Sequence, residues 1–592
     1  MKNNRPPRQP GLTRRQMLQL FGASAVSMAA SGCGQTDGAS GPTPNPAPSG
    51  TTANPASATP SERMFRHGVA SGEPLPNAVV IWTRPTPSDD AVPGSGLGAD
   101  VPLTWEMATD PLFTQVVRMG NVVATSATDH CVHVDVTGLQ SGRYFWYRFK
   151  SGELTSPVGR TRTAPDSASS PAALRFGIVT CAEWEFGHFG AYRILAGRDD
   201  VEAVIHMGDY IYEFGRGYGP IATPGASFGR LHEPDREIVT LQDYRIRYGQ
   251  YRSDVNLRAL HARHPFITIY DDHEIANDWW REGAENHTEG AEGTFVNRLT
   301  AGLRAWREWQ PLRQFSATDP RQAWRKMQFG DLVDLWLLDT RLYRDRQPTN
   351  AIVGYGSVDP AVDSPTRTIL GAVQKTWLKT GLAASTARWK VLGNQVPFYP
   401  FLVGPGLPTA LAPLATAGAG TLPPLPATLS VEDWNGYRAE QREIIATMAT
   451  IQNSVVLTGD YHESFAAEIP SSTGDYPADG NSVGVEFICP SVTSPGLSET
   501  LGRAGLPVPE NIDRIFEANL TASNPWVKYH EGFSNGFAVI EFAREKTQYD
   551  YWFIADRTNP NTTARVAASW EVRNGAGKLF RSAAALPART LT

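Results

Sequence analysis

The chain has 592 residues, of which 41% are hydrophobic and 19% are charged, a composition that excludes a collagen-like, coiled-coil or wholly disordered protein. Its formal net charge is −6, but the first 33 residues hold five basic residues and no acid, leaving 49 basic against 60 acidic residues beyond them. A domain this acidic is poorly suited to binding the phosphate backbone of nucleic acids, which requires clustered Lys and Arg. We therefore expect no specific nucleic-acid partner.

The N-terminal segment 1–33 has the features of a twin-arginine export signal. Arg14 and Arg15 precede a modest apolar stretch at residues 18–30, and no acid occurs before it. The alternative interpretation is a short amphipathic helix. Because the twin-arginine (Tat) route carries proteins that have already folded, the Tat export machinery is an expected partner and a cofactor could be loaded before export.

A lipid attachment site is the second feature of this segment. Ala30-Ser31-Gly32-Cys33 is similar to a lipoprotein processing site in which Cys33 would carry the lipid, although Ala30 stands where Leu is usual, so simple cleavage near this point is the alternative. Residues 34–60 consist mainly of Pro, Ser, Thr, Gly and Ala and predict a disordered linker. The expected location is periplasmic, secreted, or anchored to a membrane by lipid.

If Cys33 is lipidated or removed, three cysteines remain, and at least one of them must be a free thiol. Cys131 and Cys489 lie in apolar strand-like segments and are expected to be buried. Cys181 follows the strand-like residues 174–179 and stands in polar company.

The remainder of the chain divides by pattern into two domains and a C-terminal extension. Short alternating strands separated by Gly, Pro and Ser predict a small β-sandwich of fibronectin or immunoglobulin type at 61–165. Apolar strands alternating with helical stretches predict an α/β layered domain at 166–555. Within it, the Gly-, Pro- and Ala-rich segment 403–429 predicts a surface loop, either a variable insertion or a lid. Residues 556–592 have no predicted role.

Four predicted strands of the α/β domain end in residues that can bind metal. Ligands in open α/β sheets bind beyond the carboxyl ends of strands, so residues at these points converge even when they are far apart in sequence. Singly, each segment could be a turn, a helix cap or a buried cysteine, but four in one domain indicate a site. The segments are Thr180-Cys181, Gly208-Asp209-Tyr210-Ile211-Tyr212, Asp271-Asp272-His273-Glu274 and Gly459-Asp460-Tyr461-His462.

These segments resemble the motifs of the calcineurin-like metallophosphoesterases, in particular the branch of PhoD-type alkaline phosphatases and phosphodiesterases. Thr180-Cys181 replaces the usual first motif of the superfamily, and this departure is typical of the branch. The resemblance extends over about residues 64–555 and includes Asn277-Asp278-Trp279-Trp280 and Leu338-Asp339-Thr340-Arg341. It implies a layered αββα metallophosphoesterase domain behind the N-terminal β-sandwich.

The donor types suggest two adjacent metal sites. Thiolate and phenolate donors favour a strongly Lewis-acidic metal, which suggests an iron-type site at Cys181, Asp209 and Tyr212. Oxygen-rich donors suit a hard cation, and the neighbouring ligands are expected to be Asp272, Asn277, Asp460 and His462, with Asp209 placed to bridge. Asp271 could exchange roles with Asp272. The resemblance implies Fe³⁺ and Ca²⁺ as cofactors.

The expected reaction is hydrolysis of phosphate mono- and diesters by a metal-activated hydroxide or oxide. His273 could donate a proton to the leaving oxygen, or it could orient Asp272. Arg341 is a candidate phosphate clamp because its planar fork matches phosphate oxygens, or it could support Asp339.

Two other functions remain open on sequence grounds. One is phospholipase D-type cleavage of lipid head groups, and the other is a non-catalytic cell-surface binding protein. Trp279 and Trp280 lie beside the predicted site and could line a substrate cleft. No Walker A or His-Glu-x-x-His motif occurs, which disfavours nucleotide motors and zincins.

Overall fold

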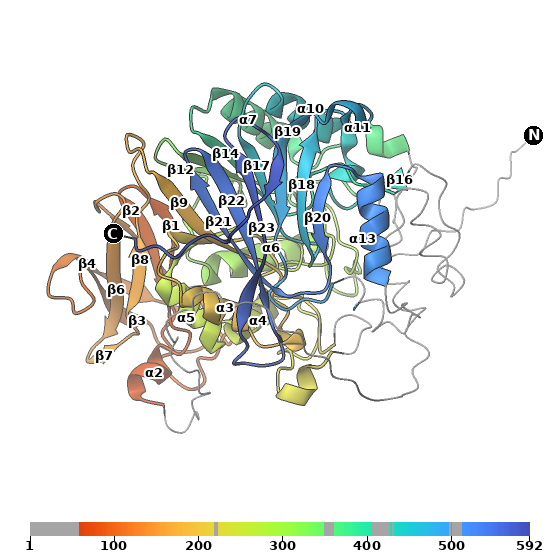
Figure 1. The fold of residues 1–592 in the computed structure, drawn as a ribbon. Helices are drawn as coiled ribbons and strands as arrows, with labels where there is room; N and C mark the ends of the chain where they lie inside the picture. Colours follow the sequence, from red (N-terminus) through yellow and green to blue (C-terminus); the bar gives the residue numbers. More distant parts are fainter. Residues whose placement is uncertain are drawn as a thin grey trace, which may run out of the picture.

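The computed structural model describes residues 58–217, 223–348, 360–403, 427–428, 431–496, 499 and 512–591. The predicted export signal, Cys33, most of the linker and most of the 403–429 loop lie outside the described residues. Among the described helices, none is both long enough and apolar enough to cross a bilayer. The expected α/β class is confirmed, with three main sheets and helices on two of them (Figure 1).

A ten-stranded sheet forms the centre of the molecule. Its central strands β9, β10, β11 and β1 are parallel to one another, and their apolar runs are buried on both faces, as parallel strands require. From edge to edge the strands are β24 (Leu579–Arg581), β23 (Ala564–Arg573), β22 (Lys546–Ile554), β21 (Gly536–Ala543), β9 (Ala173–Val179), β10 (Ala203–His206), β11 (Pro265–Thr268), β1 (Val69–Leu75), β2 (Ala78–Thr83) and β5 (Val132–Thr137).

A seven-stranded sheet packs against this central sheet. Apolar side chains of the two sheets form one buried cluster, and Cys489 lies within it. In spatial order the strands are β12 (Arg325–Phe329), β13 (Val333–Leu337), β14 (Trp389–Asn394), β17 (Ser454–Thr458), β19 (Ser482–Ile488), β18 (Ser464–Pro470) and β20 (Val527–Glu531).

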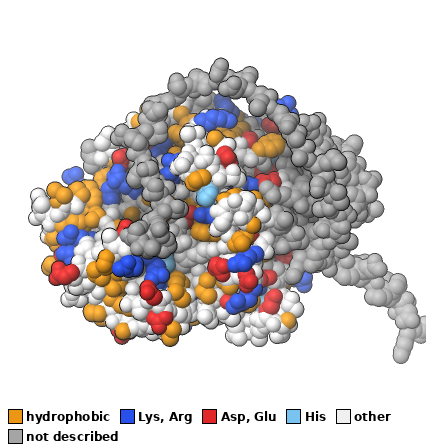
Figure 2. All heavy atoms as spheres, turned by 90° about the horizontal axis from the view of Figure 1, so that it is seen from below, with side chains coloured by type: hydrophobic (Ala, Val, Ile, Leu, Met, Phe, Trp, Pro, Cys, Tyr) orange, Lys and Arg blue, Asp and Glu red, His pale blue; other side chains and the backbone are white. Residues whose placement is uncertain are grey.

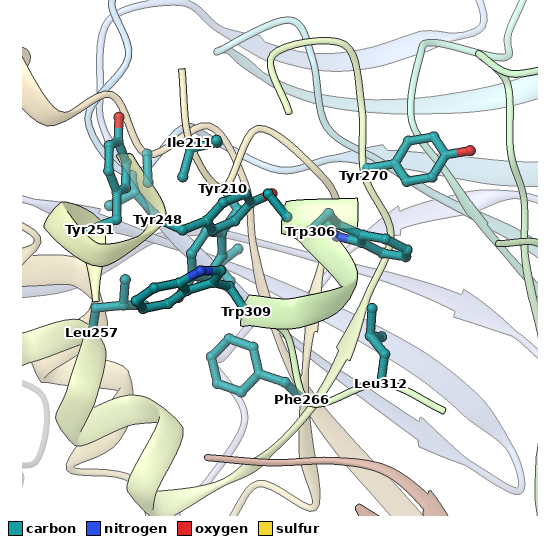
Figure 3. Close-up of a cluster of buried hydrophobic side chains, with 14 of the residues drawn as sticks. Tyr210, Ile211, Tyr248, Tyr251, Leu257, Phe266, Tyr270, Trp306, Trp309 and Leu312 are labelled. Carbon is teal, nitrogen blue, oxygen red and sulfur yellow. The ribbon is translucent and has the colours of Figure 1, made fainter. Parts of the chain in front are cut away.

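Helices cover the outer faces of both sheets. The central sheet is covered by α3 (Gly190–Ala196), α4 (Leu241–Tyr251), α5 (Val255–Arg263) and α6 (Phe295–Trp309). Aromatic side chains dominate this layer, and Figure 3 shows Tyr210, Tyr248 and Trp309 packed above Phe266 of β11. The seven-stranded sheet is covered by α7 (Gly371–Ala384) and α10 (Arg438–Met448). The remaining helices and short strands are α2 (Pro60–Met64), α11 (Tyr476–Asp479), α13 (Ile512–Ser523), β15 (Leu402–Val403) and β16 (Ala427–Thr428).

The N-terminal region contributes a third sheet. It contains β4 (Val116–Ala124), β3 (Val101–Ala108), β6 (Tyr144–Ser151) and β7 (Leu154–Thr155), with β8 (Gly159–Arg162) paired to β6. Its apolar side chains, together with those of β1, β2 and β5, form a separate buried cluster. Since β1 pairs in parallel with β11 at Ser71 and Pro265, the central sheet continues across the domain boundary expected at residue 165.

Residues 556–592, which had no predicted role, complete the other edge of the central sheet as β23 and β24. Beyond them, the C-terminal tail returns across the sheet, where Arg589 forms an ion pair with Glu202. The expected burial of Cys131 and Cys489 is confirmed. On the face shown in Figure 2, acidic and basic side chains are interspersed, so charges of both signs meet the solvent there.

Candidate metal centre and active site

The carboxyl ends of β9, β10, β11 and β17 bring the predicted ligands together. Cys181 follows β9 and Asp209 follows β10, and the Cys181 Sγ and Asp209 Oδ2 atoms are 3.4 Å apart. The Tyr212 hydroxyl donates to the same Asp209 oxygen at 3.2 Å and lies 3.1 Å from His462 Nε2. The two sheets therefore contribute donors to one cluster.

The backbone at these positions adopts a conformation that is uncommon for residues with side chains. Cys181, Asp209, Asp460 and His462 have φ angles of 57°, 54°, 65° and 60°, in the left-handed region that costs about 1–3 kcal/mol for a non-glycine residue. Such strain persists where the surrounding structure compensates for it, and its concentration on four predicted ligands marks this edge of the sheets as a functional site.

The glycine before Asp209 is required by a close approach between strands. A Cβ on Gly208 would lie 2.5 Å from the Cβ of Asp271, and the φ of Gly208 is +106°. The Gly-Asp pair thus allows the loops after β10 and β11 to meet, which places Asp209 beside Asp271 and Asp272.

Among the described residues, three groups of donor atoms are close enough to hold metal ions. Within each group the atoms lie within 4.8 Å of one another, and the groups are Cys181, Asp209 and His462; Asp209, Asp272 and His273; and Asp271, Asp272 and Asp460. Asp209 belongs to two groups, and so does Asp272. This overlap is the geometry needed for adjacent cations that share carboxylates.

The buried anions at the site need positive charge. Burial, reinforced by Asp271 and Asp272, raises the pKa of Asp209 well above its usual range, and burial likewise raises the pKa of Cys181. Burial also raises the pKa of Asp271, to about 6. Among the described residues, Asp271 Oδ2 is buried without a hydrogen-bond partner, and Asp272 Oδ1 has no hydrogen bond and only Arg341 Nη2 beside it, at 3.5 Å. A bound cation would satisfy these oxygens, so the residues fit a metal centre.

Arg341 lies in a cage of carboxylates at the same place. Its Nε donates to Asp271 Oδ1 at 2.5 Å, and its side chain is only 1% exposed. Its Nη2 lies 3.5 Å from Asp272 and 3.4 Å from Asp460. Although burial opposes its charge, these carboxylates raise the pKa of Arg341 well above the usual value. Since Asp271 is the closest partner of Arg341, Asp272 is the freer of the two adjacent carboxylates to bind metal.

The sequence also left open that Arg341 supports Asp339, and the structure shows contact between the two residues only through the backbone of Arg341. The Asp339 carboxylate accepts the main-chain N–H of Arg341 at 3.1 Å, whereas the guanidinium contacts the candidate ligands Asp272 and Asp460. Asp339 therefore holds the turn that carries Arg341, and the charged end of Arg341 is directed to the site.

His273 is clamped between carboxylates and an aromatic ring. Its Nδ1 lies 2.6 Å from Glu213 Oε2, and its ring stacks on Tyr212 with a centroid separation of 4.2 Å. Although burial opposes protonation, Asp272, Glu213 and Asp209 together raise the pKa of His273 well above its usual value. Glu213 thus holds His273 beside two candidate metal ligands, a position compatible with proton donation while the ring is protonated or with metal binding once it has lost a proton.

Two supporting residues, Glu274 and Ser494, were not predicted as part of the site. Glu274 accepts the backbone N–H groups of Asp209, Tyr210 and Asp271 and so ties the two ligand loops together. Ser494 donates its hydroxyl to the Tyr212 oxygen at 2.7 Å. Glu274 stands within a recognised motif and could have been identified from it, but the contact of Ser494 depends on a fold across hundreds of residues.

Asn277 and the two tryptophans lie at the edge of the cluster. The Asn277 amide donates to Glu285 Oε2 at 2.6 Å, and its backbone N–H donates to Glu213, so its side-chain nitrogen is turned to the carboxylate of Glu285. Trp279 is fully buried and donates to the carbonyl of Asp271, which excludes it from a cleft wall. Trp280 is partly exposed.

Comparison with known proteins points to one family. Residues 176–551 match the family described as PhoD-like phosphatase, and residues 50–165 match the PhoD-like phosphatase N-terminal domain. The chain is 34% identical over 514 residues to alkaline phosphatase D of Bacillus subtilis (strain 168), which covers 86% of this chain and 80% of that protein. A solved structure of PhoD superposes with a TM-score of 0.75 at 31% identity, covering 90% of this chain and 94% of that one.

Proposed function

Because the chain belongs to the PhoD-like phosphatase family, we propose that the residues gathered at the strand ends form the metal-dependent active site of an exported phosphoesterase. The family and the similarity to alkaline phosphatase D make the protein a hydrolase of phosphoric esters. The observation that carries the proposal is that Asp209 lies within reach of Cys181 and His462 on one side and of Asp272 on the other, while Asp272 lies within reach of Asp460. We also propose the layered αββα arrangement, with an N-terminal β-sandwich that shares the central sheet.

The ligands divide by donor chemistry into two sets that share Asp209. Thiolate, phenolate and imidazole donors suit iron, and we assign Cys181, Tyr212 and His462 to Fe³⁺. Carboxylate and amide oxygens suit Ca²⁺, and we assign Asp272, Asp460 and Asn277 to this second ion. His462, expected beside the second set, is placed with the first because its ring nitrogen lies near Cys181 and Asp209.

When bound, the two cations would supply a water of lowered pKa and withdraw charge from the phosphoryl oxygens. Arg341 would orient the phosphate, since Asp271 fixes its Nε and its Nη2 lies beside Asp272 and Asp460, so that the planar fork faces the place where the cations would hold the phosphoryl oxygens. His273 holds a proton at the ring nitrogen opposite Glu213 and passes it to the leaving oxygen. Glu213 keeps the ring in the orientation that this transfer needs.

Elemental analysis of metal-site variants tests the proposal. In protein purified without chelator, Cys181→Ser should lose iron and Asp460→Asn should lose calcium, and both should lose activity on nitrophenyl phosphate and on bis-nitrophenyl phosphate. The buried Cys489→Ser is the matched control and should retain both metals. A folded wild-type protein without metal would contradict the proposal and favour the binding-protein function. Choline release from phosphatidylcholine vesicles would identify the phospholipase D-type activity.

Export is proposed from the sequence features of residues 1–33. Replacing Arg14 and Arg15 by Lys should leave the protein in the cytoplasm if the Tat route carries it. Mass spectrometry of the mature N-terminus should show a diacylglyceryl group on Cys33 if the protein is lipid-anchored, and an unmodified N-terminus if it is released.

A further inference from the structure

A cavity of about 370 Å³ lies at the end of the sheets opposite the candidate active site. Arg388 and Lys390 flank the first residue of β14, and Asn453 immediately precedes β17. Asp460, in contrast, follows the far end of β17. Since a five-residue strand spans roughly 15 Å, the cavity is separate from the metal centre and shares no residue with it.

Positive charge predominates in this cavity. Arg388, Lys390 and Arg544 line it together with a single carboxylate, Asp331. Asp331 is already paired with Arg544 and accepts the Ser170 hydroxyl at 2.9 Å. The cavity therefore has two more cations than it has anions to neutralise them.

Arg388 and Lys390 have no carboxylate of their own. Within the described part of the chain neither forms an ion pair. Asp334 lies opposite Lys390 in the pairing of β13 with β14, but its Oδ2 is held by Lys326 Nζ at 2.7 Å. Burial lowers the pKa of Lys390, Asp334 opposes this shift, and Arg388 adds to it to a smaller extent. Asp334 is thus the nearest described carboxylate to Lys390, but it also neutralises Lys326, so the cations here outnumber the anions.

A rigid polar frame surrounds the two cations. The buried Asn453 has a left-handed φ of 61°, and its amide nitrogen donates to the Arg388 carbonyl and to Asn574 Oδ1 at 2.9 and 2.7 Å. Its amide oxygen accepts the Gly575 N–H at 2.7 Å. Because the oxygen of Asn574 is engaged, its NH₂ group is the part available to the cavity that it lines.

We propose that this cavity binds a phosphate-class oxyanion, with Arg388, Lys390 and Asn574 as its ligands. A guanidinium fork, an ammonium and an amide NH₂ together offer the donors that a tetrahedral oxyanion accepts. The volume accommodates phosphate alone or phosphate with a small organic group. The bound anion could therefore be inorganic phosphate, which is the product of a phosphatase, or the phosphoryl group of an ester.

Equilibrium dialysis of the metal-loaded full-length protein tests the inference. The probes are radiolabelled inorganic phosphate and phenylphosphonate, an ester mimic that cannot be hydrolysed. The variant Arg388→Gln/Lys390→Gln should bind one equivalent of anion fewer than the wild type and should keep its turnover, since the cavity is remote from the metal centre. The control Lys379→Gln/Arg442→Gln removes the same charge from exposed parts of α7 and α10 and should bind as the wild type does.

The pattern of binding by the two variants supports or overturns the proposed anion site. If the cavity variant binds one equivalent of inorganic phosphate fewer than the wild type, free phosphate is a ligand of the cavity. If it binds fewer equivalents of phenylphosphonate only, the ligand is a phosphate ester. Equal binding by the cavity variant and the wild type, with both folded by circular dichroism, would overturn the inference. An equal loss in the control variant would also overturn it, because diffuse surface charge would then explain the binding.

Discussion

Glu213 controls His273 more directly than any other described side chain does. Its Oε2 lies 2.6 Å from His273 Nδ1, and its Oε1 accepts the backbone N–H of Asn277 and the amide of Asn286. A carboxylate at this place fixes the tautomer and the orientation of the imidazole and favours the imidazolium. Replacing Glu213 should therefore weaken the proposed proton transfer from His273 to the leaving oxygen.

We predict that Glu213→Gln and His273→Ala both reduce turnover of alkyl phosphates far more than turnover of nitrophenyl phosphate. Nitrophenolate leaves without a proton, whereas an alkoxide requires one, so the difference should approach the roughly 10²–10⁴-fold typical of general acid catalysis. Steady-state kinetics on the two substrates measure it. Glu237→Gln, which removes a neighbouring carboxylate that contacts Asn286 instead of His273, is the control. Equal losses on both substrates would show that His273 acts as a metal ligand or as a structural residue.

At the level of residues, the sequence predicted the ligand types better than their contacts. Cys181, Asp209 and His462 could be identified because each follows a strand in a recognisable pattern, and the structure brings their donor atoms within 4.8 Å. The contact of Ser494 with Tyr212 could not be identified, since it depends on the approach of segments 282 positions apart. The pairing of Arg341 with Asp271 likewise required coordinates.

At the scale of elements, Glu486 joins three segments behind the site. It lies in β19, accepts the N–H groups of Phe398 and Tyr399, and accepts the Thr458 hydroxyl at the end of β17. Burial raises its pKa from the model-compound value of 4.5 to about 7. The folded state therefore binds more protons than the unfolded state between pH 4.5 and 7, and stability falls as the pH rises through this window.

We predict that Glu486→Gln removes the fall in stability that the ionisation of Glu486 causes as the pH rises. Relative to the variant, the free energy of unfolding of the wild type should fall by up to about 3 kcal/mol between pH 5 and pH 8, because each shifted pKa unit corresponds to about 1.4 kcal/mol. Denaturant titrations at several pH values measure the slope. Glu282→Gln, at a side chain that is 74% exposed, should keep the wild-type slope. An unchanged slope in Glu486→Gln would mean that the carboxyl is charged throughout.

The C-terminal tail stabilises the central sheet through another buried carboxylate. Arg589 Nη2 donates to both oxygens of Glu202 at 2.9 and 2.8 Å, and the Glu202 side chain is 9% exposed. Arg589→Gln should lower the free energy of unfolding by about 3 kcal/mol, the usual cost of leaving a buried ion without its partner. Thermal and denaturant unfolding measure this loss. Arg573→Gln, an arginine with a 64% exposed side chain, should change little, and an equal loss in both variants would refute the role of the tail.

The hydrophobic pattern of the sequence predicts where the strands lie, but it does not predict which strands pair with one another. Apolar runs such as β9 and β17 predict buried strands because parallel strands are covered on both faces. The partnership of β1 with β11 and the return of β23 and β24 to the central sheet are non-local, and the local pattern carries no record of the partner strand. The N-terminal region thus shares a sheet that the change in sequence pattern did not reveal.

At the scale of the whole molecule, the proposed metal centre lies where the two packed sheets meet. Cys181 and Asp209 follow strands of the central sheet, whereas Asp460 and His462 follow β17 of the other sheet. Without cations, burial raises the pKa of Asp209 and Asp460 well above the usual range. Ionising these carboxyl groups in the folded state therefore costs free energy. Because a metal binds only the deprotonated ligands, metal binding stabilises the ionised form.

We predict that chelation destabilises the protein and that the loss grows with pH. An acid with a raised folded-state pKa lowers stability as the pH rises from its ordinary value to the folded one, and the assigned ligands Asp209 and Asp460 are both raised well above the usual range. Metal binding removes this penalty and adds its own binding free energy. The gap in Tm between metal-loaded and chelator-treated protein should thus widen from pH 5 to pH 7, and restoring iron and calcium should close it. Arg573→Gln should show the same widening, whereas Asp209→Asn should show a smaller one. A gap that is constant with pH would mean that the carboxylates at the junction of the sheets are not the groups that metal binding keeps ionised.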